Sequence, residues 1–267
     1  MNILKITILY KMKSITVMKK PAIFLLAVFG SLSLGAQITG QPANYTANSA
    51  DGGVSDALYN YAMGAISDKT AKSSFLDDSI EGSPYMSNSF SSGKLYYGDE
   101  LVGDIYYRYN AYNEEMEVKQ SNLENERIRG LSKDKKIKLV VLGKPMSFKT
   151  FVDKSGNTKN GYMTLLADGD YKLYKHLKVT FKEAKKAENT FVKSTPAKFS
   201  QYTEYYLEHP DGKRIDQIEL NNKKLIQLVE ANKSNELKSF LKENNIKVKD
   251  ENDLYQVFNF LNNTSGS

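Results

Sequence analysis

The feature that most constrains the fold is a change of hydrophobic period at residue 221. Between Gly93 and Leu220, tyrosine, β-branched and other apolar residues alternate with polar ones in runs that are separated by short polar breaks. A period of two is typical of strands with one buried face, and short breaks favour antiparallel pairing. From Asn221 onward the apolar residues take helical spacing. The sequence therefore predicts a mainly β fold with a C-terminal α appendage (α+β), its antiparallel meander sheets forming a sandwich or a partly open barrel.

The individual elements follow from the same pattern. The expected strands are Lys94–Tyr97, Asp104–Tyr109, Glu115–Lys119, Lys138–Leu142, Ser147–Val152, Gly161–Ala167, Tyr171–Glu183, Phe199–Glu208 and Arg214–Leu220. The expected helices are Ser55–Ile66, Asn222–Ala231, a second C-terminal helix capped by Ser234 and a third capped by Asp250. Helices this short are not stable alone, so they must pack on each other or on the sheet.

The N-terminal residues have the layout of a secretory signal peptide. Met18-Lys19-Lys20 is a positive region, the short apolar run from Pro21 to Leu34 follows it, and Gly35-Ala36 supplies small residues for cleavage. We expect residues 1–36 to be removed, with Met12 or Met18 as the initiator. An uncleaved membrane anchor is the alternative, although the apolar run is shorter than the roughly 20 residues that a spanning helix needs.

This leader sets the expected organisation and location. Residues 37–92 are expected to be a mobile or irregular segment with a short helix, 93–220 an antiparallel β domain and 221–263 a helical subdomain. We expect an exported protein of the periplasm, the outer-membrane surface or the extracellular space, with no transmembrane span after leader cleavage. The oligomeric state does not follow from the sequence.

Charge and cysteine content exclude several functions. The five lysines of residues 1–36, where no acid occurs, account for all but +1 of the net charge of +6. A nucleic-acid partner therefore loses its compositional support. The chain contains no cysteine, which excludes disulfides, thiol catalysis, zinc–thiolate sites and a lipid anchor on cysteine.

A family resemblance is carried by a series of short segments in fixed order. They are Gly35-Ala36-Gln37, Gly82-Ser83-Pro84-Tyr85, Gly93-Lys94-Leu95-Tyr96, the run from Arg108 to Glu117, the run from Tyr171 to Glu183, and Asn221-Asn222-Lys223-Lys224-Leu225. In these, the chain resembles a family of uncharacterised exported proteins of Bacteroidetes, especially flavobacteria, over most of its mature length. The resemblance implies export but no activity, and it assigns no functional residue.

The acidic and histidine residues give no recognisable catalytic or metal motif. A carboxylate site built from Glu114, Glu115 and Glu117 with Asp99 and Asp104 is conceivable, but paired carboxylates act as acid and base only when their surroundings split their pKa values. A solvated strand face is the expected state of these acids.

Asp153 to Asn160 carries oxygen-bearing side chains at alternate positions, as a calcium loop does, but Thr164 stands where the closing glutamate belongs. A hairpin turn is expected there. His176 and His209 are expected to be surface or hydrogen-bonded residues. We assign no catalytic, cofactor-binding or metal-binding residue, and no cofactor.

The tyrosines are the best indication of a binding role. Adjacent strand residues point to opposite faces, and Tyr97, Tyr107 and Tyr205 are our candidates for the outer face, where they would form a binding surface. Ordinary sheet composition is the alternative, because tyrosine favours strands in any case. Ser79, in Asp78-Ser79-Ile80, is a candidate for O-glycosylation.

The function expected from the sequence is therefore coarse. We predict a non-enzymatic cell-envelope or secreted protein that binds a partner, an envelope protein or a polysaccharide, through its tyrosine-rich sheet or its C-terminal helices. A hydrolase with an unrecognised carboxylate site and a purely structural envelope component are the alternatives.

Overall fold

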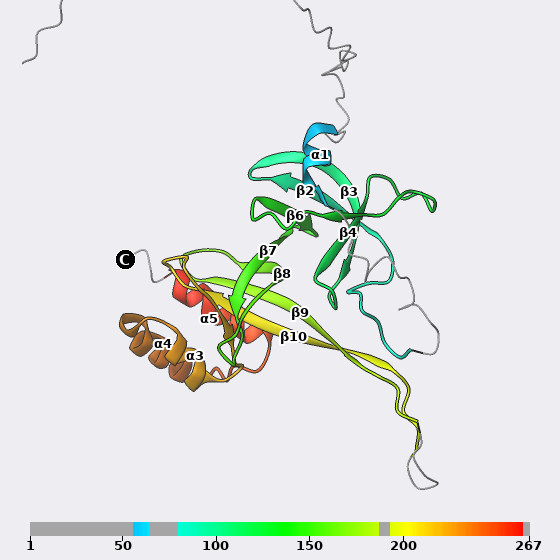
Figure 1. Cartoon of the computed structure of the whole chain (residues 1–267). Coiled ribbons are helices and arrows are strands. Elements are labelled where there is room, and N and C mark those ends of the chain that lie inside the picture. Colours follow the sequence, from blue (N-terminus) through cyan, green and yellow to red (C-terminus); the bar gives the residue numbers. More distant parts are fainter. Residues whose placement is uncertain (1–55, 65–79, 187–192, 264–267) are drawn as a thin grey trace, which may run out of the picture. The chain divides into compact units, whose positions relative to one another are not determined.

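The strands belong to one sheet that is followed by a group of helices (Figure 1). The computed structural model describes residues 56–64, 80–186 and 193–263, all within the unit 48–267. The expected leader, Ser79 and most of the segment 37–92 lie outside the described residues. The predicted fold class, mainly β with C-terminal helices, is confirmed.

Most strand bounds lie within a few residues of the expected ones, but the expected helix Ser55–Ile66 is wrong at its end: it stops at Ala62, and Met63–Gly64 forms a short strand. In chain order the elements are α1 (Asp56–Ala62), β1 (Met63–Gly64), β2 (Ser91–Tyr97), β3 (Glu100–Asn110), β4 (Glu115–Lys119), β5 (Arg129–Leu131), β6 (Ile137–Val141), β7 (Lys144–Val152), β8 (Thr158–Ala167), β9 (Lys172–Lys182), β10 (Lys198–Glu208), β11 (Ile215–Ile218), α3 (Asn222–Leu228), α4 (Ala231–Glu243) and α5 (Glu251–Asn263).

Two further local predictions are corrected by the structure. No strand was expected between Lys119 and Lys138, yet Arg129–Leu131 forms β5 and pairs with β4 and β1. Ser234 was expected to cap the second C-terminal helix. That helix begins at Ala231, so Ser234 lies inside it. The capping role of Asp250 is confirmed, because its side chain accepts hydrogen bonds from the amides of Asn252 and Asp253 at the start of α5.

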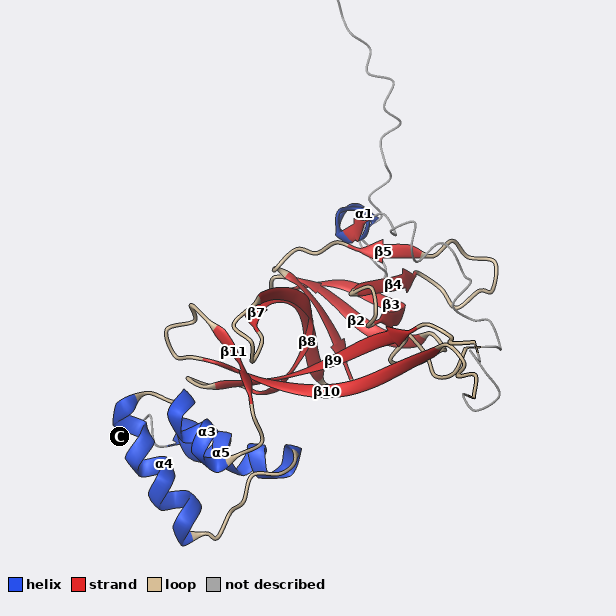
Figure 2. Ribbon diagram, turned by 60° about the horizontal axis from the view of Figure 1, so that its bottom comes forward, coloured by secondary structure: helices blue, strands red, loops and turns tan. Residues whose placement is uncertain are grey.

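The sheet order is β1-β5-β4-β3-β2-β6-β7-β11-β10-β9-β8, with β7 also paired to β8. Five strands, β7 to β11, therefore pair in a cycle (Figure 2). The cycle is barely closed: β7 and β11 meet at the single parallel bridge between Val152 and Asp216, whereas the other pairings in the sheet are antiparallel. The hairpin β9–β10 is the longest ladder, with pairing from Lys172–Glu208 to Lys182–Lys198.

Three buried clusters hold these elements together. The first packs α1 against β2–β7 and includes Leu95, Ile105 and Leu139. The second packs the C-terminal helices against the ends of β9, β10 and β11, and includes Leu173, Leu207 and Phe258. The third takes one residue from each strand of the cycle: Phe151, Met163, Tyr174, Tyr206 and Ile215. Burial of this apolar surface is the main force that stabilises the fold. No helix within the described ranges has both the length and the apolar content to cross a membrane.

Candidate functional site

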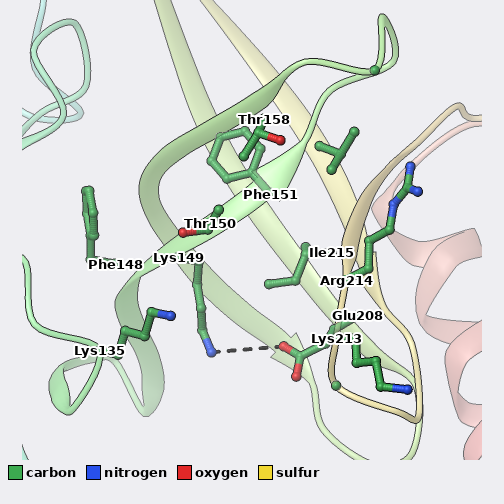
Figure 3. A pocket seen from close by; sticks show the side chains of 13 residues that line it. Lys135, Phe148, Lys149, Thr150, Phe151, Thr158, Glu208, Lys213, Arg214 and Ile215 are labelled. Atoms are coloured by element: carbon green, nitrogen blue, oxygen red, sulfur yellow. Dashed lines mark ion pairs between the residues drawn. The ribbon is translucent and has the colours of Figure 1, made fainter.

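A cleft of about 790 Å³ lies where β7 and β11 separate (Figure 3). On its way through the sheet β7 changes partner: Ser147 pairs with Lys138 of β6, and Val152 bridges to Asp216 of β11. Between these two points the strands on this side of β7 diverge. The hairpin turns that follow β7 and β10 contribute Gly156 and Gly212 to the walls, both with positive φ angles that suit glycine.

Cationic side chains dominate the cleft. Figure 3 shows Lys135 and Lys149 on one side of it, and Lys213 and Arg214 on the other. Glu208 is the one acid among the lining residues. The lining therefore carries a net positive charge of about three, counted at neutral pH.

Three of these cations lie near an acid, and for two of them that acid is outside the lining. Lys213 Nζ lies 3.5 Å from Asp211 Oδ2. Lys149 Nζ lies 4.0 Å from Glu208 Oε2, and the Tyr174 hydroxyl donates a hydrogen bond of 2.8 Å to the same carboxylate oxygen. Arg214 donates from Nε to Asp216 Oδ1 at 2.7 Å, which leaves its two terminal nitrogens for a ligand. Lys135 has no ion-pair partner among the described residues.

The floor of the cleft is apolar. Phe148, Phe151, Val152 and Ile215 line it, and Phe151 is buried. A ligand in this cleft would meet both cations and hydrocarbon. The arrangement therefore suits an anionic molecule with an apolar part better than a bare ion.

Behind Phe151 lies a cluster of three charged groups, the buried His176 and the partly buried Glu114 and Glu204. His176 Nε2 is 2.8 Å from Glu114 Oε1, and His176 Nδ1 is 3.5 Å from Glu204 Oε2. The second contact is an ion pair whose geometry does not make a hydrogen bond. The Phe151 ring packs on the imidazole with 5.1 Å between ring centroids, and so separates this cluster from the cleft.

The two carboxylates keep the imidazole charged. Burial lowers the pKa of His176, but the hydrogen bond to Glu114, the ion-pair contact with Glu204 and the charges of both carboxylates outweigh burial and raise it to about 9. Burial raises the pKa of Glu204, but the ion-pair contact with His176 and the hydrogen bonds from Lys178 and Tyr206 lower it to about 2. With both ring nitrogens facing carboxylates, His176 has no free position for acid–base work. Its part is to link Glu114 of the β3–β4 turn with β10.

The acids singled out in the sequence do not gather in one site. Glu117 was expected on a solvated face, but it is 2% exposed. Arg108 donates to Glu117 Oε2 from Nε at 2.8 Å and from a terminal nitrogen at 2.6 Å. The Tyr85 hydroxyl also donates to Glu117. Asp99 and Asp104 lie on the surface in ion pairs with Lys138 and Lys94.

The predicted tyrosine surface is not formed. Tyr107 is buried in the first core, because it shares the inward face of β3 with Ile105 and Tyr109. Tyr205 is partly covered, and its hydroxyl donates to Glu251 of α5 at 3.0 Å. Tyr97 is half-buried and packs edge-on against Tyr61, with 5.2 Å between ring centroids.

The remaining candidate residues have structural roles. Asp153 closes the β7–β8 hairpin turn by accepting from the amides of Ser155 and Asn157, so the hairpin prediction is confirmed. His209 pairs with Asp216 at 3.2 Å. Among the described residues, no three histidine or acidic side chains are placed to hold a metal ion.

Sequence reasoning missed the cleft. Lys135, Lys149 and Lys213 come from three turns and strands that are far apart in the chain, and no local spacing connects them. The one signal was basic residues beside the Asp-Gly and Ser-Gly turns. No protein-family model, curated protein or solved structure matches this chain.

Proposed function

We propose that this protein is a non-enzymatic binding protein that holds an anionic ligand in the cleft between β7 and β11. The observation that carries the proposal is the set of four cations around one open cleft with a single acid among them. Clefts lined by one sign of charge concentrate the field and favour ligands of opposite charge.

The chemistry of the lining supports a carboxylate or phosphate group on the ligand. Guanidinium and ammonium groups bind both, and their hydrogen bonds to charged acceptors are shorter and stronger than neutral ones. The apolar floor at Phe148 and Phe151 adds contact for the uncharged part of the ligand.

The expected location completes the proposal. An exported protein of the cell envelope, as the leader and the family resemblance indicate, would meet acidic envelope proteins and acidic polysaccharides. The alternative of a hydrolase gains no support at Glu117, which faces Arg108 rather than a second acid. A purely structural component would not require an open cationic cleft.

Charge reversal in the cleft tests the proposal. Lys135→Glu and Lys213→Glu together alter exposed lysines, so the fold should tolerate them. The matched control is Lys238→Glu with Lys242→Glu, which makes the same change of net charge on exposed residues of α4. The probes are fluorescein-labelled polyglutamate, polygalacturonate and inorganic polyphosphate, followed by fluorescence anisotropy with the full chain at low salt.

The cleft variant should bind at least one probe about tenfold more weakly than the parent, because exposed charge pairs contribute roughly 0.5 to 1 kcal/mol each. The control variant should stay within about threefold of the parent. Equal losses in both variants would mean that binding follows net charge alone, and the proposed site would be wrong.

A further inference from the structure

The cleft contains an unpaired strand edge in the middle of the sheet. On the side of β7 that faces away from β8, pairing with β6 ends at Ser147 and pairing with β11 is confined to Val152. The residues between, Phe148 to Phe151, pair with β8 through Tyr162 to Lys159. Within the described part of the chain, no strand pairs with them on their other side. All four line the cleft.

The direction of the main-chain groups along this edge follows from the ladder. In an antiparallel pair, alternate residues turn both N–H and C=O toward the same neighbour. The amide of Asp153 donates to the carbonyl of Asn157 on the β8 side at 2.9 Å, and the β7–β8 register has no shift. Phe151 and Lys149 therefore also face β8.

Thr150 then turns both its N–H and its C=O toward the cleft. Phe148 faces the same side, but the pairing of Ser147 with Lys138 uses the Phe148 N–H, so Phe148 offers its C=O alone. The bridge to β11 agrees with this assignment, because Val152, two residues beyond Thr150, is the β7 residue that it uses. Thr150 is exposed and lines the cleft, and no described strand is in register with it on this side. An accessible strand edge is a template on which another chain can pair.

We infer that the anionic ligand is an extended acidic peptide, which pairs with the main chain of β7 at Phe148 and Thr150 while its carboxylates meet Lys135, Lys149, Lys213 and Arg214. This inference rests on the proposed function, since it names the ligand class for the same cleft. Four extended residues span about 13 Å, so the paired part of the peptide is about three or four residues long.

The strand edge favours an acidic peptide over an acidic polysaccharide as the ligand. A peptide repeats an N–H and a C=O every second residue along one edge, in the spacing that β7 presents. An acidic polysaccharide can satisfy the cations but has no such repeat. The basic residues on both walls favour acidic side chains over neutral ones, because like charges repel and opposite charges attract across a cleft.

The first experiment uses peptides with alternate amides blocked. The parent probe is a labelled acetyl-Glu-Val-Glu-Val-Glu peptide, and two analogues carry N-methyl groups on the glutamates or on the valines. If the peptide pairs with β7, one analogue loses the bonded amides and binds about tenfold more weakly, while the other keeps them and binds within about threefold. Equal affinity of all three peptides would overturn strand pairing.

The second experiment changes the edge itself. Thr150→Pro removes an amide that faces the cleft and not β8, so the β7–β8 ladder keeps its hydrogen bonds. Peptide affinity should fall about tenfold, while polyphosphate affinity, which needs only the cations, stays within about twofold. Thr150→Val is the matched control, because it retains the amide. Should Thr150→Pro prove unfolded by circular dichroism, the N-methyl series decides alone.

The outcomes separate the two proposals. If the Lys135→Glu, Lys213→Glu variant weakens every anionic probe but N-methylation has no effect, the anionic cleft stands and strand pairing is wrong. If polygalacturonate binds more tightly than the peptide and ignores Thr150→Pro, the ligand is a polysaccharide and the peptide inference is wrong. If no probe responds to charge reversal, both proposals fail.

Discussion

Replacing Gly161 by alanine tests whether the Glu114 carboxylate is held in place. Gly161 lies in β8 directly below that carboxylate: an added Cβ would meet Glu114 Oε2 at 2.7 Å and Cδ at 2.8 Å. The backbone at Gly161 is not in the left-handed region. Where the conformation permits, a glycine-to-alanine change stabilises a protein by about 0.4 to 1 kcal/mol. The contact between the added Cβ and Glu114 therefore decides whether the substitution stabilises or destabilises the fold.

The carboxylate cannot move aside without loss. It accepts from the Tyr109 hydroxyl at 2.5 Å and from the Tyr162 amide at 3.1 Å, and it pairs with His176 at 2.8 Å. Losing a bond to a charged group costs roughly 1.5 to 3 kcal/mol, and a buried hydroxyl left without an acceptor costs about 1 to 3 kcal/mol more. After subtracting the gain from alanine, we expect Gly161→Ala to destabilise the fold by about 3 kcal/mol.

Thermal unfolding followed by circular dichroism measures this. For a domain of this size Tm should fall by about 6 to 12 °C, at roughly 2 to 4 °C per kcal/mol. In a Glu114→Ala background the added methyl group has no carboxylate to meet, so Gly161→Ala should be neutral or stabilising there. A Gly161→Ala variant as stable as the parent, or an equal loss in both backgrounds, would refute the reasoning.

Two further predictions concern buried charges. The folded pKa of His176, about 9, is above its ordinary value of 6.5, so its contribution to the free energy of unfolding is complete below pH 6.5 and is lost as pH rises through 9. The folded pKa of Glu204, about 2, is below its ordinary value of 4.5, so its contribution is complete above pH 4.5 and is lost as pH falls through 2. Urea unfolding midpoints should therefore show their largest contribution from this cluster between about pH 4.5 and 6.5, and an unchanged alkaline decline in His176→Gln would contradict the assignment. Arg108→Met should cost about 3 to 5 kcal/mol, because it leaves Glu117 charged and buried without its partner. The double variant with Glu117→Gln should recover part of this loss in urea unfolding, and strictly additive effects would argue against the pair.

Much of the fold was predictable because strand alternation is a local property. The runs in β9 and β10 could be placed within a residue or two, since apolar and polar positions alternate there over long stretches. β5 was not found, because three residues among charged neighbours carry no period. Its strand state comes from pairing with β4 and β1.

The tyrosine assignment failed for a reason that face parity explains. Tyr107 has the same parity as Ile105 and Tyr109, and all three are buried, so the face that carries Ile105 should have been chosen as the inner one. At Tyr205 parity is of no use, because the neighbouring Tyr206 is buried on the opposite face and α5 covers the Tyr205 side. The alternation of apolar and polar residues along a strand does not predict which of its faces a helix from a distant part of the chain will cover.

The burial of charged residues was the other feature that the sequence analysis did not predict. Hydropathy treats Glu117 as a surface residue, but Arg108 stands directly opposite it in the β3–β4 ladder. Two opposite charges at a cross-strand pair can enter the interior together. The cleft could not be foreseen at all, because it exists only where strands from distant parts of the chain fail to pair.

The long hairpin β9–β10 has a consequence for how the chain can be divided. The half nearer the connection between the two strands, at Val179 and Phe199, belongs to the first core. The other half, at Leu173 and Leu207, belongs to the core that the C-terminal helices cover. One pair of strands thus gives side chains to cores at both of its ends. The change of period at residue 221 marks where helices follow strands, but it is not a domain boundary. A chain that ended there would expose to solvent the apolar side chains of the half of the hairpin that the helices cover. Gene truncations and fusions should respect the hairpin rather than the boundary between strands and helices.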